Sequence, residues 1–211
     1  MEELMMGTEL AYGHWGTVAF NTIIWTAAAY LLIRPERRVE YANIALFGLF
    51  LFVTHVESYG YPFTLSLFAD QLARYPSADH LGWRAGDLWR VLLDASGREG
   101  AFDWFHIIAG VLIFGGLIVL FLSRKALEAA LASGVPATAG PYRWVRHPQY
   151  LALYSIMLGN LVQSPALVTL LLFPVLIYLY AGLARREEQE LLARFGPAYE
   201  IYCKRTPRFL R

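Results

Sequence analysis

The sequence predicts an all-α protein, a polytopic integral membrane bundle of about five transmembrane helices whose last two form a hairpin. Of the 211 residues, 57% are hydrophobic and only 17% are charged, which is too apolar for an ordinary soluble domain. The hydrophobic residues form continuous runs, most of them near the ~20 residues that a helix needs to cross a bilayer. These runs do not alternate between apolar and polar side chains, so helices are favoured over the strands of a barrel.

The apolar runs define the expected spans in chain order. They cover residues 15–33, 41–59, 102–122, 150–162 and 166–183. Charged or helix-breaking residues end most of the runs, as expected where a span reaches the membrane surface. The fourth run is short for a full crossing, and a three-residue turn with a proline joins it to the fifth, so these two runs predict a tight hairpin.

The chain divides into two expected parts. Residues 1–101 would hold the first two spans and a polar outer connection at 64–101, where short interfacial helices are expected. Residues 102–211 would form the core that carries the remaining spans and the polar motifs. The acidic N-terminus does not resemble a cleavable signal peptide, which would begin with basic residues.

Basic residues predict the orientation of the bundle. They gather after the first span, between the third and fourth spans, and after the fifth: Arg34, Arg37, Arg38, Arg124, Lys125, Arg143, Arg146, Arg185, Arg186, Lys204, Arg205 and Arg208. With five crossings all of these clusters fall on one side, which the positive-inside rule makes cytoplasmic. We therefore expect an outside N-terminus, a cytoplasmic C-terminus, and a reduced thiol at the single cysteine, Cys203. The net charge of +1 gives no reason to expect a nucleic-acid partner.

Two polar motifs lie at the expected cytoplasmic ends of spans. The first, Gly140-Pro141-Tyr142-Arg143-Trp144-Val145-Arg146-His147-Pro148-Gln149-Tyr150, precedes the fourth span, and the second, Arg185-Arg186-Glu187-Glu188, follows the fifth. Ionisable groups beside lipid are costly to desolvate and are therefore often functional. Because a hairpin brings its two ends together, His147 and Glu187 should be neighbours. Pro148 suits the first turn of a helix.

The two motifs together resemble the membrane methyltransferases that include isoprenylcysteine carboxyl methyltransferase and the phospholipid N-methyltransferases. The resemblance covers about residues 102–211 and rests on the GxYRxxRHPxY stretch followed by a helix with Glu-Glu. It implies S-adenosyl-L-methionine as cofactor and S-adenosyl-L-homocysteine as product. The implied cofactor contacts are Tyr142, His147, Pro148, Gln149, Tyr150 and Glu187, with Glu188 as a second carboxylate and backbone near 134–137.

The residue types at the motifs suit this cofactor chemically. The two glutamates can bind the ammonium group or ribose hydroxyls, and Arg143, Arg146 and His147 can bind the carboxylate. Tyrosine rings offer aromatic surface to the adenine and the sulfonium. Methyl transfer mainly requires that nucleophile and methyl group be held in line away from water. A carboxylate acceptor needs no base, whereas a thiol or amine does, and Glu188 and His147 are the candidates for that catalytic role.

The methyl acceptor is expected to be a membrane lipid or another amphiphile. A phospholipid amine, an isoprenoid-linked thiol or carboxylate, and a small hydrophobic thiol all remain open, as does the oligomeric state. Two positions depart from the family pattern: Ala152 replaces a usual glycine, and Leu183 replaces an arginine that holds the substrate carboxylate in isoprenylcysteine enzymes. These departures weaken the isoprenylcysteine assignment and keep open a relative that binds the cofactor without catalysis.

A second polar set on the outer side supports an alternative function. His55 and Glu57 lie in the second span and His106 opens the third. A non-catalytic membrane protein could use these three residues to bind haem or a metal, although they show no recognised metal-ligand spacing within one helix. Structural pairing, for example of Glu57 with His106, is the simpler interpretation, and no metal site is expected.

Overall fold

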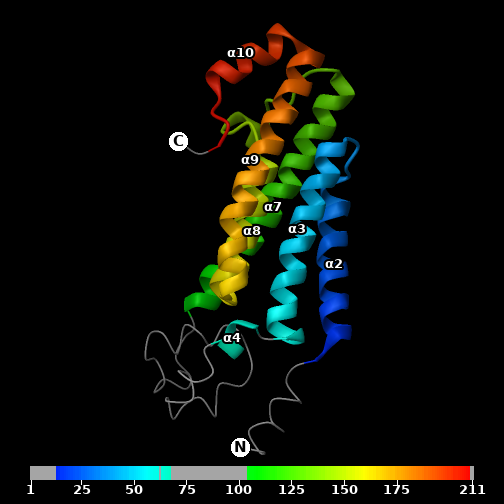
Figure 1. Ribbon diagram of the computed structural model, residues 1–211. Coiled ribbons are helices and arrows are strands. Elements are labelled where there is room, and N and C mark those ends of the chain that lie inside the picture. Colours follow the sequence, from blue (N-terminus) through cyan, green and yellow to red (C-terminus); the bar gives the residue numbers. More distant parts are fainter. Residues whose placement is uncertain (1–12, 62, 68–103, 210–211) are drawn as a thin grey trace, which may run out of the picture.

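The computed structural model describes residues 13–61, 63–67 and 104–209. Within these ranges the chain is helical and has no strand, which confirms the predicted all-α class. Figure 1 shows the bundle with the start of α2 at one end and α10 at the other. The described elements are α2 (Trp15–Ile33), α3 (Arg38–His55), a π-helical turn η1 (Val56–Gly60), α4 (Phe63–Leu67), α7 (Trp104–Ser133), a 3-10 turn η4 (Gly140–Arg143), α8 (Pro148–Gln163), α9 (Leu167–Phe195) and α10 (Pro197–Arg205).

Four described helices are long and apolar enough to cross a membrane: α2, α3 with its η1 turn, α7 and α9. The 30 residues of α7 and the 29 of α9 correspond to about 45 Å of helix, more than the ~30 Å of a hydrocarbon core. Large apolar side chains such as Phe20, Val111, Phe114 and Leu171 are exposed, as expected of a surface that faces lipid. The protein is therefore an integral membrane protein.

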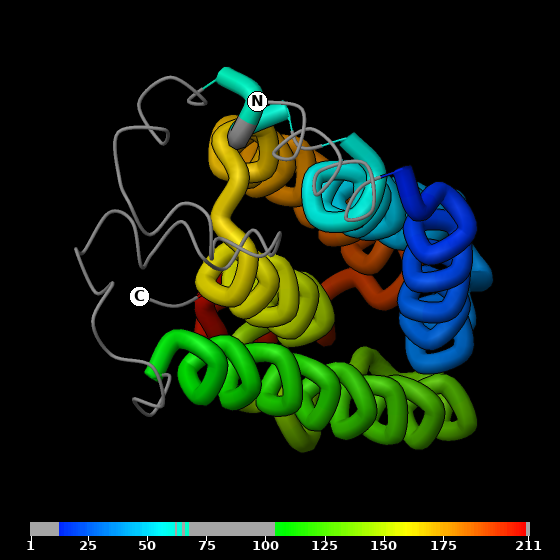
Figure 2. Tube along the Cα trace, turned by 90° about the horizontal axis from the view of Figure 1, so that it is seen from below, coloured from blue at the N-terminus to red at the C-terminus, as the bar shows by residue number. Residues whose placement is uncertain are grey.

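The predicted fourth span corresponds to α8, which has 16 residues. Seen along the bundle, α8 lies between α7 on one side and α3 and α9 on the other (Figure 2). Its side chains, among them Tyr150, Leu153 and Met157, belong to a continuous core shared with α2, α3, α7 and α9. This central position explains why a short helix is stable here: it is buried by its neighbours along most of its length.

The turn between α8 and α9 lies at the end of the bundle opposite to the two motifs. The helices end at Gln163 and begin at Leu167, as the sequence predicts. The backbone N–H of Leu167 donates to Oγ1 of Thr64 in α4 at 2.8 Å. The turn between α8 and α9 is therefore attached to α4 at this end of the bundle.

Glycines allow α7 and α8 to approach closely. A Cβ on Gly116 would lie 2.7 Å from the carbonyl oxygen of Ala152, and one on Gly159 would lie 2.9 Å from that of Ala109. Small residues at such crossings let helices pack backbone to backbone inside a membrane. Ala152, the departure from the family pattern, is buried at this α7–α8 contact.

Two helices extend further than their apolar runs predict. α7 continues to Ser133 and α9 to Phe195, each about three turns past the expected end of its span. These extensions are rich in Ala, Leu, Glu and Arg, which favour helices, and contain pairs such as Arg124–Glu128 at 2.8 Å. Of the expected outer connection at 64–101, only residues 64–67 of α4 are described; the remainder lies outside the described residues. The division of the chain near residue 101 stays a prediction.

Candidate functional site

The hairpin brings the two motifs together at one end of the bundle. His147 is the residue before α8 and is buried, while Glu187 and Glu188 lie in the extension of α9. Nδ1 of His147 is 3.3 Å from Oε2 of Glu187, and Nε2 is 3.1 Å from Oε1 of Glu188. Both nitrogens of one imidazole therefore face carboxylates, and Pro148 opens α8 directly behind it.

This arrangement favours the protonated form of His147. Burial lowers the pKa of His147, but hydrogen bonds to Glu187 and Glu188 raise it, and the net result is a pKa above its usual value. Only the imidazolium can donate from both ring nitrogens at once. His147 is therefore suited to joining the two carboxylates as a double donor.

Glu188 also accepts from two arginines. Nη1 of Arg146 is 3.0 Å from Oε1 of Glu188. Arg208 approaches from the C-terminal segment with Nε at 2.9 Å from Oε1 and Nη2 at 2.5 Å from Oε2, a bidentate geometry. The sequence indicates only that Arg208 belongs to a basic cluster, and no signal in it places Arg208 on Glu188.

The C-terminal segment lies across the first motif. The backbone N–H of Arg146 donates to the carbonyl of Pro207 at 2.9 Å, and the hydroxyl of Tyr202 donates to the carbonyl of Tyr142 at 2.6 Å. The ring of Phe209 lies 5.8 Å from that of His147, centroid to centroid. The C-terminal segment thus helps to enclose the imidazole.

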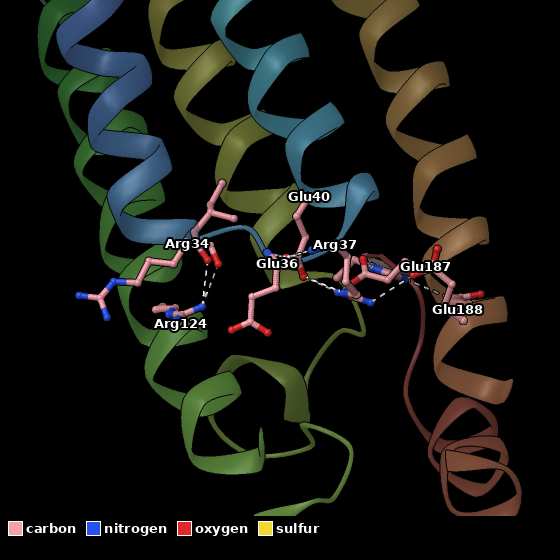
Figure 3. A network of polar contacts seen from close by, with 10 residues as sticks. Arg34, Glu36, Arg37, Glu40, Arg124, Glu187 and Glu188 are labelled. Carbon is pink, nitrogen blue, oxygen red and sulfur yellow. Dashed lines mark hydrogen bonds and ion pairs between the residues drawn. The ribbon is translucent and has the colours of Figure 1, made fainter. Parts of the chain in front are cut away.

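Glu187 is paired with a residue from the other half of the chain. Nη2 of Arg37 contacts Oε1 of Glu187, and the same guanidinium is bound by Glu40, with Nε 2.9 Å from Oε1 of Glu40 (Figure 3). In the sequence Arg37 is one of the basic residues that predict only the orientation of the bundle. Its role at the site could not be foreseen, because 150 positions separate it from Glu187.

A cavity opens beside these residues. It is bounded by the α2–α3 connection, the end of α7, the loop before η4, the extension of α9 and α10. Its lining includes Arg34, Arg37, Glu40, Arg124, Val135, Pro136, Ala137, Tyr142, Arg146, Glu187, Tyr199 and Tyr202. Three of the predicted cofactor contacts, Tyr142, Arg146 and Glu187, therefore share one cavity with the loop at 135–137.

The other predicted contacts lie behind the cavity wall. His147 and Glu188 contact lining residues, whereas Tyr150 is 2% exposed and packs in the core with its ring 5.6 Å from that of Tyr180. Within the described part of the chain, Nε of Arg146 and Nε2 of Gln149 are buried without a hydrogen-bond partner. Such groups cost about 1–3 kcal/mol when unpaired.

The second polar set forms a different arrangement at the other end of the bundle. Nδ1 of His55 is 3.0 Å from Oγ1 of Thr22, and Glu57 accepts the backbone N–H of Thr64 at 3.0 Å. No group of three His, Cys, Asp or Glu residues that could hold a metal occurs in the described ranges, which include His55, Glu57 and His106. Within these ranges the three residues therefore do not form a metal-binding group, and haem binding by them stays a prediction. Pairing of Glu57 with His106 stays a prediction.

Comparison with known proteins points to one family. Residues 123–193 match the model of the isoprenylcysteine carboxyl methyltransferase (ICMT) family. Over 71 residues the chain is 34% identical to a Schizosaccharomyces pombe protein named Protein-S-isoprenylcysteine O-methyltransferase; the alignment covers 33% of this chain and 30% of that protein. No solved structure matches the chain. The matched residues include both polar motifs.

Proposed function

We propose that the protein is an S-adenosylmethionine-dependent membrane methyltransferase whose acceptor is the carboxylate of an isoprenoid-linked cysteine or a similar amphiphile, because residues 123–193 match the model of the isoprenylcysteine carboxyl methyltransferase family. The observation that carries this proposal is the contact of His147 with Glu187 and Glu188, beside a cavity lined by arginines and tyrosines. S-adenosylmethionine, when bound, supplies a sulfonium methyl group to the acceptor oxygen, so a C–O bond forms as an S–C bond breaks.

The cavity residues match the groups of this cofactor. Glu187 is an acceptor for the ammonium group or the ribose hydroxyls, and the guanidinium of Arg146, which lines the cavity, suits the carboxylate. Tyr142, Tyr199 and Tyr202 supply aromatic surface on the same wall. His147 and Glu188 act behind this wall by holding Glu187 and Arg146 in place.

Hydrogen bonding at the site favours an acceptor that needs no base. His147 has a raised pKa and donates from both nitrogens when it is protonated, so it has no free lone pair to take a proton. Glu188 already accepts from Arg146 and Arg208, which makes it a weak base. An amine or a thiol would have to lose a proton, whereas a carboxylate would not. Of the acceptors left open by the sequence, the carboxylate therefore fits best.

We place the site on the cytoplasmic face, where the cofactor is available, with an outside N-terminus. The apolar part of the acceptor would reach it from the membrane, near the half-buried Tyr154 and Phe209 next to His147. Arg208, whose side chain is 37% exposed, lies at this edge and is available to an anionic acceptor.

The acceptor can be tested with purified protein and tritiated S-adenosylmethionine. We expect label to enter S-farnesylcysteine and to be released as methanol by mild base, because it is held in an ester. Phosphatidylethanolamine and a hydrophobic thiol serve as competing acceptors. Label in either of these, with none in S-farnesylcysteine, would contradict a carboxylate acceptor, and a failure to bind S-adenosylhomocysteine in calorimetry would contradict the cofactor.

A further inference from the structure

The connection between α2 and α3 lies far outside the matched segment 123–193, yet it forms one wall of the cavity. Arg34, Glu36, Arg37 and Glu40 all line it. The connection is fixed to α7, because Nη1 of Arg124 donates to the carbonyl of Ile33 at 3.0 Å (Figure 3). This bond satisfies one of the free carbonyls at the end of α2. The wall is therefore held in place by α7, whose C-terminal part lies at the start of the matched segment.

Within this wall, Glu40 holds Arg37 in one orientation. Glu40 is buried, and its Oε1 accepts from Nε and Nη2 of Arg37 at 2.9 and 2.5 Å. Its Oε2 accepts the backbone N–H groups of Glu36 and Arg37 at 2.8 and 3.2 Å. Both carboxylate oxygens are thus used to fix the guanidinium and the backbone that carries it. A planar guanidinium held in this way loses little further freedom when it binds a second carboxylate.

That second carboxylate is Glu187. Its Oε1 contacts Arg37 and its Oε2 contacts His147, so two cations from separate elements determine the plane of the carboxylate. The charge on His147 depends on pH, whereas a guanidinium stays charged. Arg37 is therefore the permanent partner of a glutamate that lines the cavity.

We propose that Arg37, fixed by Glu40, is the residue that positions the Glu187 carboxylate for the cofactor, so that the first helical hairpin is an integral part of the active site. This inference rests on the proposed function, since it assigns a role at the same cavity. It predicts that Arg37 affects cofactor binding through Glu187 and leaves the acceptor contacts unchanged.

The test compares Arg37→Gln and Arg37→Lys with Arg38→Gln. Arg38 is the next residue, is exposed and does not line the cavity, so its change removes the same charge elsewhere. We expect Arg37→Gln to weaken S-adenosylhomocysteine binding by about tenfold or more in calorimetry. It should also raise the KM for S-adenosylmethionine and leave the KM for S-farnesylcysteine unchanged. Arg37→Lys should retain part of the affinity, because lysine keeps the positive charge but lacks the planar guanidinium that binds two groups at once. Arg38→Gln should bind S-adenosylhomocysteine like the wild type.

A double variant shows whether Arg37 acts through Glu187. The double variant Glu187→Gln with Arg37→Gln should bind S-adenosylhomocysteine no more than about twofold more weakly than the weaker single variant. The reason is that both changes remove the same interaction. If the two losses simply add, Arg37 does not act through Glu187. If Arg37→Gln fails to fold in a thermal scan, Glu40→Gln replaces it; this variant keeps oxygen and shape but loses the charge that holds Arg37.

The outcomes separate this inference from the proposed function. If Glu187→Gln leaves S-adenosylhomocysteine affinity unchanged, the cofactor site itself is wrongly placed. If Glu187→Gln weakens binding while folded Arg37→Gln or Glu40→Gln binds like the wild type, only the positioning role is overturned. Equal rises in the KM values of cofactor and acceptor would also overturn it, because they indicate a general structural effect.

Discussion

His147 lies between two glutamates that face different parts of the site, Glu187 on the cavity side and Glu188 beneath the C-terminal segment. Replacing it with alanine removes the donor shared by both carboxylates. We expect His147→Ala to weaken S-adenosylhomocysteine binding by about tenfold or more, equivalent to ~1.4 kcal/mol, in calorimetry. His55→Ala is the matched control, since His55 contacts Thr22 at the far end of the bundle. Equal affinities for the wild type and His147→Ala would remove His147 from the site.

The raised pKa of His147 also predicts how stability depends on pH. A group whose pKa is higher in the folded state stabilises the fold fully below its unfolded pKa, ~6.5, and loses that contribution as pH rises through the folded value. The difference in melting temperature between the wild type and His147→Gln should therefore be largest near about pH 6 and shrink toward about pH 9. A difference that grows with pH would show that His147 is neutral in the folded protein.

Single residues of the site were predictable where a local pattern surrounds them. The predicted cofactor contacts Tyr142, Arg146 and Glu187 follow from two motifs at the ends of a hairpin, and all three line one cavity. Arg37 and Arg208 could not be chosen among many basic residues, because their partners are set by packing between distant segments. Tyr150, another predicted contact, packs in the core, and its role at the site stays a prediction.

At the level of helices, the contact between α7 and α8 determines where His147 lies. Gly116→Ala would place a methyl group 2.7 Å from the carbonyl of Ala152 and 2.7 Å from the side chain of Ile156. We expect a loss of about 1–3 kcal/mol in stability and weaker S-adenosylhomocysteine binding, because α8 must move away. Gly115→Ala is the control: it has open space around it and should be neutral or slightly stabilising in a thermal scan. Equal melting temperatures for the two variants would show that the crossing is not tight.

The helices themselves could be predicted well, and their ends less so. The span at 15–33 has the predicted bounds, and the turn between α8 and α9 falls where its proline predicts it. Hydropathy detects only the part of a helix that faces lipid, so it ends α7 and α9 too early. It also gives no sign that α8 is central, because burial by protein and burial by lipid select similar side chains.

For the whole molecule, the proposed orientation can be tested through the single cysteine. Cys203 lies in α10, at the end of the bundle opposite to the start of α2, and is partly exposed (Figure 1). A membrane-impermeant maleimide should label it in inverted vesicles and leave it unlabelled in sealed right-side-out vesicles. Tyr61→Cys in a Cys203→Ser background should give the opposite result, since Tyr61 is 57% exposed at the other end. Labelling of both sites from the same side would contradict an odd number of membrane crossings between Tyr61 and Cys203.

The pairing of Arg37 with Glu187 has a consequence for biosynthesis. The two residues are 150 positions apart, so the ribosome releases the first hairpin long before the acidic partner is made. Glu40, by contrast, lies only three residues from Arg37 and is made together with it. The Arg37–Glu187 pair can form only after the last long helix has been made, so a chain interrupted before that point lacks both glutamates that contact His147.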